Sequence, residues 1–156
     1  MPQVVLFQPQ IPPNTGNVAR TCAATNSELH LIEPLGFEIN DRQLRRAGLD
    51  YWPWVKLQLH ADFAAFSQHQ LERGGRLLAL SRQGARPYAQ ERFAANDWLL
   101  FGRETDGLPQ EVLQSCSQSL AIPMAGSIEH GGGVRSLNLS VAVGVVLFEA
   151  LRQLEP

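Results

Sequence analysis

The sequence predicts one α/β domain over residues 1–156, built on a parallel sheet that is flanked by helices. Short apolar runs alternate with helix-like segments from end to end. Most of the runs read as continuous apolar segments, as is typical of strands buried on both faces of a parallel sheet. Because we find no linker, internal repeat or low-complexity tract in the sequence, we predict a single domain.

The elements follow from this pattern in chain order. Six apolar runs predict strands at 3–7 (QVVLF), 29–32 (LHLI), 54–59 (WVKLQL), 76–80 (RLLAL), 97–101 (DWLLF) and 119–122 (SLAI). The intervening segments predict helices at 15–25, 41–47, 61–72, 109–116 and 136–153. Asn14 is expected to cap the first helix, and Pro109 suits the first position of the fourth. Ser136 or Asn138 is expected to cap the last helix.

Composition limits the class of protein. With 44% apolar and 18% charged residues, the chain is typical of a globular protein with a real core. Its first residues do not resemble a secretory signal, and no apolar stretch reaches the roughly 18–20 residues that span a bilayer. We therefore expect a cytoplasmic protein with no membrane segment. Cys22 and Cys116 are far apart in sequence, which predicts buried, reduced thiols and no structural metal.

The charged residues leave two explanations open. The net charge of −2 argues against a global basic field for binding nucleic acid. Lys56 is nevertheless the only lysine among 13 basic residues, and the other twelve are arginine. Arginine suits bidentate phosphate contact and stacking on bases, but a genome rich in G and C raises arginine in the same way. The excess of arginine over lysine does not by itself distinguish RNA binding from genome composition.

The last predicted helix is apolar almost all round. Its middle leaves no polar face, because it consists largely of Val141, Val143, Val145, Val146, Leu147 and Phe148. A helix that lies on one side of a small sheet keeps a polar stripe. Its second side is therefore expected to be covered, either by another copy of the chain or by insertion deep within its own fold. We favour a homodimer.

Three loops at the carboxyl ends of the predicted strands have unusual chemistry. Ligands of parallel sheets bind there, and the loops span 8–16, 102–109 and 123–138. The first places Asn17 and Arg20 on one helix face, near helix amides that suit an anion. The first loop carries neither a Walker ending nor a GxGxxG pattern, which disfavours ATP and NAD. An ordinary helix start with a surface arginine remains equally open.

The second and third loops add further candidates. Gly102 at a strand end would let a ligand lie against bare backbone. Glu104 beside Arg103 is a candidate site residue, although the two could instead form a surface ion pair of little energetic weight. Arg135 precedes a helix start, where a cation is unfavourable to the helix and a bound anion would explain it.

Three motifs then converge on one family. The sequence has NxGNxxR at 14–20, FGxExxGLP at 101–109 and IPM…RSLNLSxAVxVVxxE at 122–149. These resemble, in order, the motifs of the SPOUT (trefoil-knotted) RNA methyltransferases. With EPLGF at 33–37 and LRRAGLDY at 44–51, the chain is similar in particular to the tRNA (cytidine/uridine-34)-2′-O-methyltransferase group. The resemblance covers nearly all of residues 3–153.

The resemblance implies a C-terminal trefoil knot, an obligate homodimer and S-adenosylmethionine (AdoMet) as methyl donor. It implies tRNA as substrate, methylated on the 2′-oxygen of the wobble nucleotide. Cofactor-binding positions carried over from the family are Leu80, Gly102, Ile122, Ser136 and Leu137. Leu80 and Ile122 would wall the pocket, although core packing explains them equally well.

The same resemblance assigns catalytic positions to Arg20, Glu104 and Asn138. Because a guanidinium stays protonated, we expect Arg20 to hold the target phosphate and stabilise charge on the 2′-oxygen, not to act as a base. The family's arginine loop could serve the partner subunit's cofactor. Residues expected to contact RNA or shape the site are Asn14, Asn17, Arg42, Arg45, Arg46 and Arg135.

One departure and two alternatives accompany this reading. The glycine-rich segment 125–134 is longer than the link usual in the group, which could alter substrate choice. Methylation of ribosomal RNA or of another tRNA site is the first alternative. The second is a noncatalytic RNA-binding or assembly factor on the same scaffold, which the presence of Arg20, Glu104, Ser136 and Asn138 disfavours.

Overall fold

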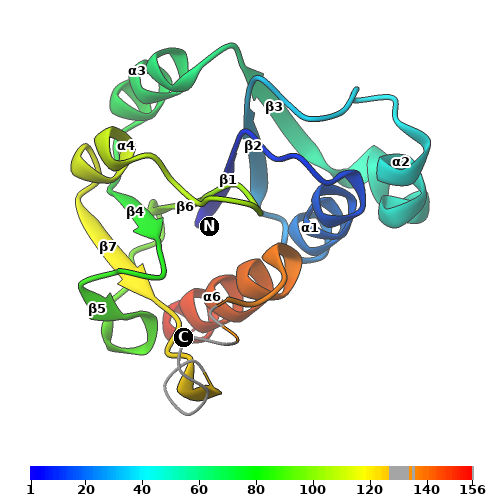
Figure 1. The fold of residues 1–156 in the computed structure, drawn as a ribbon. Helices are drawn as coiled ribbons and strands as arrows, with labels where there is room; N and C mark the ends of the chain where they lie inside the picture. The colour runs from blue at the N-terminus through cyan, green and yellow to red at the C-terminus, as the bar shows by residue number, and fades with distance from the viewer. Residues whose placement is uncertain (127–133, 135, 156) are drawn as a thin grey trace.

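A computed structural model describes residues 1–126, 134 and 136–155, with the side chains of 48–50 excepted (Figure 1). Its seven strands form one sheet in the order β3-β2-β1-β6-β4-β7-β5, and every pair of neighbours is parallel. The strands are β1 (Gln3–Phe7), β2 (Glu28–Ile32), β3 (Lys56–His60), β4 (Leu77–Leu80), β5 (Arg86–Pro87), β6 (Trp98–Phe101) and β7 (Gln118–Ala121). The predicted parallel sheet is confirmed.

Helices connect and cover these strands. The α-helices are α1 (Pro12–Thr25), α2 (Arg42–Gly48), α3 (Phe63–Arg73), α4 (Gln110–Gln114) and α6 (Leu139–Leu154), and two 3₁₀ helices are η1 (Leu49–Trp54) and η2 (Tyr88–Gln90). Within the described ranges, none of these helices has the length and hydropathy of a segment that crosses a bilayer.

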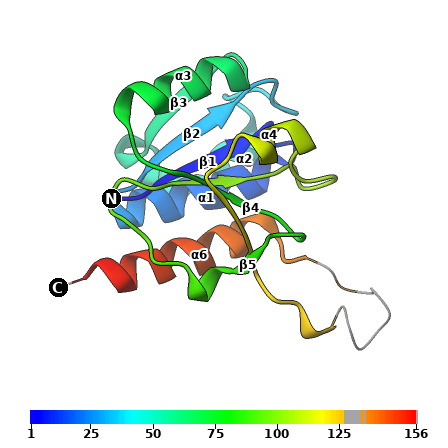
Figure 2. The same ribbon diagram turned by 90° about the vertical axis from the view of Figure 1, so that its left-hand side faces the viewer.

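Alternating side chains of the central strands build two cores. Val4 and Leu6 of β1 face one core, together with residues of α1 and α6. Val5 and Phe7 face the other, together with Phe66 of α3 and residues of α4. Figure 2 shows α3 and α4 on one face of the sheet and α1 and α6 on the other. Both faces are covered, which explains why the strands read as unbroken apolar runs.

Several predicted boundaries were wrong for physical reasons. Helix α1 begins at Pro12, not after Asn14, because a proline at the first helical positions lacks only an N–H that would have no helical partner. Asn14 therefore lies in the first turn and does not cap the helix. Trp54 belongs to η1 and not to β3, and the two-residue strand β5 is too short to produce an apolar run.

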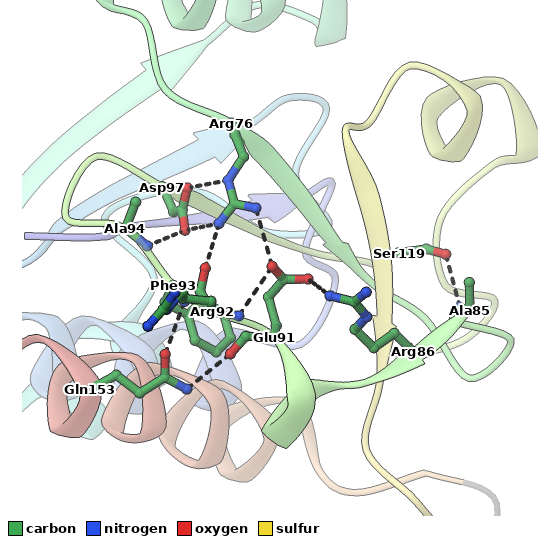
Figure 3. A network of polar contacts seen from close by, with 10 residues as sticks. All are labelled: Arg76, Ala85, Arg86, Glu91, Arg92, Phe93, Ala94, Asp97, Ser119 and Gln153. Atoms are coloured by element: carbon green, nitrogen blue, oxygen red, sulfur yellow. Dashed lines mark hydrogen bonds and ion pairs between the residues drawn. The ribbon is translucent and has the colours of Figure 1, made fainter.

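A polar network ties the far end of α6 to the strands (Figure 3). The Arg76 guanidinium donates to the buried carboxylates of Asp97 and Glu91 at 2.8–3.1 Å. Glu91 also accepts from Arg86 of β5. Gln153 of α6 donates to the Glu91 carbonyl oxygen and accepts from the Phe93 amide. The segment between β5 and β6 is thereby fixed to the last helix.

The last helix buries only part of its apolar surface. Val143, Val146 and Leu147 are fully buried, whereas Val141 and Phe148 are 50% and 55% exposed. Insertion of this helix deep within its own fold is therefore wrong. The exposed apolar strip of α6 is the surface to which the predicted second copy of the chain would pack.

A histidine cluster lies under α3. His30 is fully buried, and its ring nitrogens lie 2.9 Å from His60 Nε2 and 2.9 Å from the Glu28 carboxylate. Burial lowers the pKa of His30 from 6.5 to about 4 and also lowers the pKa of His60. His30 therefore remains neutral in the folded protein at pH values where the unfolded chain takes up a proton.

We predict that acid weakens the fold through His30. Its folded pKa is depressed, so its contribution is complete above the unfolded pKa and is lost as pH falls from about 6.5 towards about 4. The free energy of unfolding should drop by roughly 3 kcal/mol over this range. Denaturant titrations at several pH values would measure it. A His30→Gln variant, which keeps hydrogen-bonding capacity without titrating, should show a shallower slope, and an identical slope would contradict the assignment.

Candidate functional site

A pocket of about 440 Å³ opens at the carboxyl ends of three adjacent strands. Because β1, β6 and β4 are parallel neighbours, the loops that follow them meet at one edge of the sheet. Residues from α1 and from the start of α6 complete the walls. Its lining includes Ile11, Asn14, Leu80, Ser81, Arg82, Gln83, Phe101, Gly102, Arg103, Glu104, Ser136, Leu137, Asn138 and Leu139.

The loop after β6 folds back on itself as a tight turn. The backbones of Arg103 and Gly107 exchange two hydrogen bonds of 3.0–3.3 Å, and Gly107 has φ +71°. A Cβ on Gly102 would come within 2.5 Å of the Gly107 carbonyl carbon. Gly102 is thus needed for the close approach of its own loop. The sequence predicts a glycine here so that a ligand can lie against the backbone, but the contact with Gly107 already explains why residue 102 is a glycine.

Side chains of this loop fix it against the loop after β1. The Glu104 carboxylate accepts from the Gln10 amide at 2.9 Å, and Thr105 donates to the Gln10 side chain at 2.8 Å. Arg103 pairs with Asp106 at 2.6 Å, which lowers the pKa of that carboxyl. The alternative of an Arg103–Glu104 surface ion pair is therefore wrong. Glu104 also lines the pocket.

Asn138 joins the starts of the last and first helices. Its side-chain oxygen accepts from the Ser140 amide at 2.9 Å, which makes Asn138 the N-cap of α6. Its side-chain amide donates to Asn14 Oδ1 at 3.0 Å. Asn14 is 7% exposed and belongs to α1. The capping prediction for Asn138 is confirmed, and the contact with Asn14 gives the first turn of α1 a place in the pocket wall.

The predicted cofactor-binding residues mostly gather in this pocket. Leu80, Gly102, Ser136 and Leu137 all line it, and Leu80 also packs against the core. Ile122 does not line the pocket and packs against the core instead, as its alternative explanation held. The candidate Arg135 and most of the glycine-rich segment lie outside the described residues.

The predicted RNA-contacting arginines lie elsewhere on the same chain. Arg20 is exposed, does not line the pocket, and stacks over the Tyr51 ring at 5.1 Å from the ring centre. Arg45 stacks over Trp52 at 4.7 Å. Asn17 is exposed on α1, and Arg42 and Arg46 are exposed on α2. Within one chain, the structure brings Glu104, Asn138 and Asn14 together but does not bring Arg20 to them.

Sequence reasoning missed several residues of the pocket. Gln10 supplies the amide that holds Glu104, while Arg82 and Gln83 line the wall after β4. The position of 81–83 directly after a predicted strand was the signal that could have found them. Arg82 lines the pocket and makes no ion pair with any residue in the described ranges.

The lining suits an organic ligand that carries both an apolar and a charged part. Leu80, Phe101 and Leu139 offer apolar walls, whereas Glu104 and Arg82 supply one negative and one positive group. A volume of about 440 Å³ is in the range of small-molecule sites. Among the described residues, no group of three acidic, histidine or cysteine side chains could hold a metal ion.

Nearly the whole chain is similar to known proteins. The model of the SpoU rRNA Methylase family matches residues 1–148. A tRNA (cytidine(34)-2′-O)-methyltransferase of Saccharophagus degradans is 48% identical over 97% of this chain and 94% of that protein.

Solved structures agree with this match. One described as "Structural insights into the 2-OH methylation of C/U34 on tRNA" has a TM-score of 0.91 and 53% identity, and the match covers 99% of this chain and 96% of that one. An AdoMet-bound rRNA methyltransferase from Sinorhizobium meliloti has a TM-score of 0.87 and 27% identity, covering 99% of this chain and 57% of that one.

We predict that Asn138→Ala lowers the free energy of unfolding by about 1–2 kcal/mol, because α6 loses its N-cap and the link to Asn14. Asn138→Asp retains the cap acceptor and loses only the donor to Asn14, so it should cost less than Asn138→Ala. Ser136→Ala is the matched control, since Ser136 is exposed and does not cap the helix. Denaturant unfolding would measure all three. Equal losses in the two alanine variants would contradict the assigned cap.

Proposed function

Because the chain belongs to the SpoU rRNA methylase family, we propose that it methylates the ribose 2′-oxygen of nucleotide 34, a cytidine or uridine, in tRNA. The observation that carries this proposal is the similarity of nearly the entire chain to proteins named for that reaction. The family description itself refers to rRNA. Methylation of rRNA or of another tRNA site is therefore the second candidate, and a noncatalytic RNA-binding role is the third.

The pocket supports AdoMet as the methyl donor. AdoMet has an adenine ring, a sulfonium and a zwitterionic amino-acid end, so it requires apolar walls together with groups of both charges. Leu80 and Leu137 would pack beside the adenine, and the Arg82 guanidinium would face the carboxylate. The Glu104 carboxylate lies on the wall where it would favour a positive group. When bound, AdoMet supplies an electrophilic methyl group.

The residues of the chain would act by position and by charge. The hydroxyl must approach the methyl carbon in line with the bond to sulfur, and positioning dominates such a step. Asn138 and Glu104 are fixed by their contacts with Asn14 and Gln10, so both offer rigid walls. The Arg20 guanidinium would hold a phosphate of the RNA and stabilise negative charge on the 2′-oxygen. It would not accept the proton, which would pass to water as the oxygen–methyl bond forms and the methyl–sulfur bond breaks.

A homodimer would complete the site. In one chain Arg20 lies outside the pocket, so its proposed role requires that it reach the pocket of a partner subunit. The exposed Val141 and Phe148 on α6 would be covered in this dimer. The trefoil knot and a cytoplasmic location remain predictions of the family resemblance.

The proposed function is tested by mass spectrometry of tRNA from cells with and without the gene. Loss of the 2′-O-methyl group at position 34 in the deletion strain, and its return with the wild-type gene, is the expected result. An unchanged tRNA profile with loss of an rRNA methyl group would favour the second candidate. Unchanged methylation in both RNAs would contradict an enzymatic role.

Variants of Arg20 test its proposed charge role. Arg20→Ala should lower the methylation rate by about 10²–10³-fold, because the charge that stabilises the 2′-oxygen is lost. Arg20→Lys retains the charge and should keep measurable activity. AdoMet affinity, measured by calorimetry, should be unchanged in both variants, because the proposed role of Arg20 is to contact the RNA phosphate and the 2′-oxygen and not AdoMet. Equal loss of rate in both variants with intact tRNA binding would instead favour strict geometry.

A further inference from the structure

A hollow of about 410 Å³ lies between the second half of α1, η1 and the start of β3, away from the residues that line the cofactor pocket. Its lining includes Tyr51, Pro53, Trp54 and Lys56, together with Ala23 and Ala24 of α1. Trp54 is 67% exposed and Tyr51 is 40% exposed. Exposed aromatic rings that line one hollow are candidates for an interaction site.

Cations surround these rings. Arg20 stacks over Tyr51, Arg45 stacks over the neighbouring Trp52, and the exposed Lys56 lies at the rim of the hollow. The Trp52 indole donates to the Arg45 carbonyl oxygen at 3.0 Å, which fixes η1 against α2. The aromatic rings are therefore held by a scaffold and flanked by positive charge.

The charge of this region contrasts with that of the chain. Segments 12–26 and 42–56, which include α1, α2 and η1, carry five basic residues and one acidic residue, whereas the whole chain has a net charge of −2. The two segments pack against each other (Figure 1). Local positive charge beside open aromatic rings is the combination that binds unpaired nucleotides: rings stack on bases and cations contact phosphates.

We propose that this hollow, the η1 platform formed by Tyr51, Trp54 and Lys56, stacks an unpaired base of the RNA substrate. The inference rests on the proposed function for the identity of the RNA. Arg20 connects the two, since it contacts Tyr51 and is also the residue assigned to the substrate phosphate. A base on the platform would be a neighbour of the target nucleotide in the loop, and its stacking would hold that loop in register.

The test measures binding of a fluorescent anticodon stem-loop RNA to the full chain, without methyl transfer. Trp54→Ala should weaken binding about 5- to 100-fold, as expected for the loss of one base stack, while Trp54→Phe should restore most of it. The matched control is Leu71→Ala, which removes a 72% exposed side chain on α3. Its affinity should equal that of the wild type.

Salt dependence separates stacking from phosphate contact. Trp54→Ala should leave the slope of log affinity against log salt unchanged, whereas Lys56→Ala should reduce it by roughly 0.7, the value for one phosphate of a single strand. An abasic substitution at one unpaired position should weaken wild-type binding, and Trp54→Ala should add no further loss there. Additive losses at every position would overturn base stacking.

Two further outcomes distinguish this inference from others. If light scattering shows that the wild type is a dimer and the Trp54→Ala variant a monomer, the hollow is an interface between copies and the inference is wrong. If the wild type binds the stem-loop in a Trp54-dependent manner but methylates no tRNA at position 34, the proposed function fails while the platform stands. If the wild type methylates tRNA at position 34 but Trp54→Ala does not change the affinity for the stem-loop, the proposed function stands and the platform is overturned.

Discussion

The parallel pairing of β1, β6 and β4 is the constraint on which the rest of the structure depends. Three neighbouring strands with the same direction bring the loops at 8–10, 81–83 and 102–108 to one edge of the sheet. Each strand is buried on both faces, so the register of the loops is set by packing. The loops then fix one another, as when the Gln10 amide holds the Glu104 carboxylate.

The pocket is closed by contacts between residues that are distant in sequence. Asn138 caps α6 and holds Asn14, which is 124 positions away. The first and last helices therefore begin at the same wall. Arg20, the residue that we assign to the substrate phosphate, nevertheless lies outside that wall and against Tyr51. A dimer in which Arg20 completes the partner's pocket, as we propose, reconciles both facts.

Local patterns predicted the sheet, and the family motifs predicted part of the pocket lining, whereas neither could predict the contacts between these residues. All six predicted strands form, and the central ones β1, β4 and β6 leave apolar runs because they are buried on both faces. The strand at 86–87 leaves no such run, and the start of α1 at Pro12 depends on proline chemistry that the Asn14 cap signal obscured. The role of Gly102 and the partner of Glu104 depend on tertiary approach, which no local spacing encodes.

The most direct test of the composite site is activity in mixed dimers. One subunit would carry Arg20→Ala, and the other Gly102→Ala, whose Cβ would clash with Gly107 and displace the pocket loop. Each variant alone should be inactive. If Arg20 acts on its partner's pocket, mixed dimers have one complete site, and an equal mixture should recover about a quarter of wild-type activity. No recovery, with mixed dimers demonstrated by mass, would contradict the account.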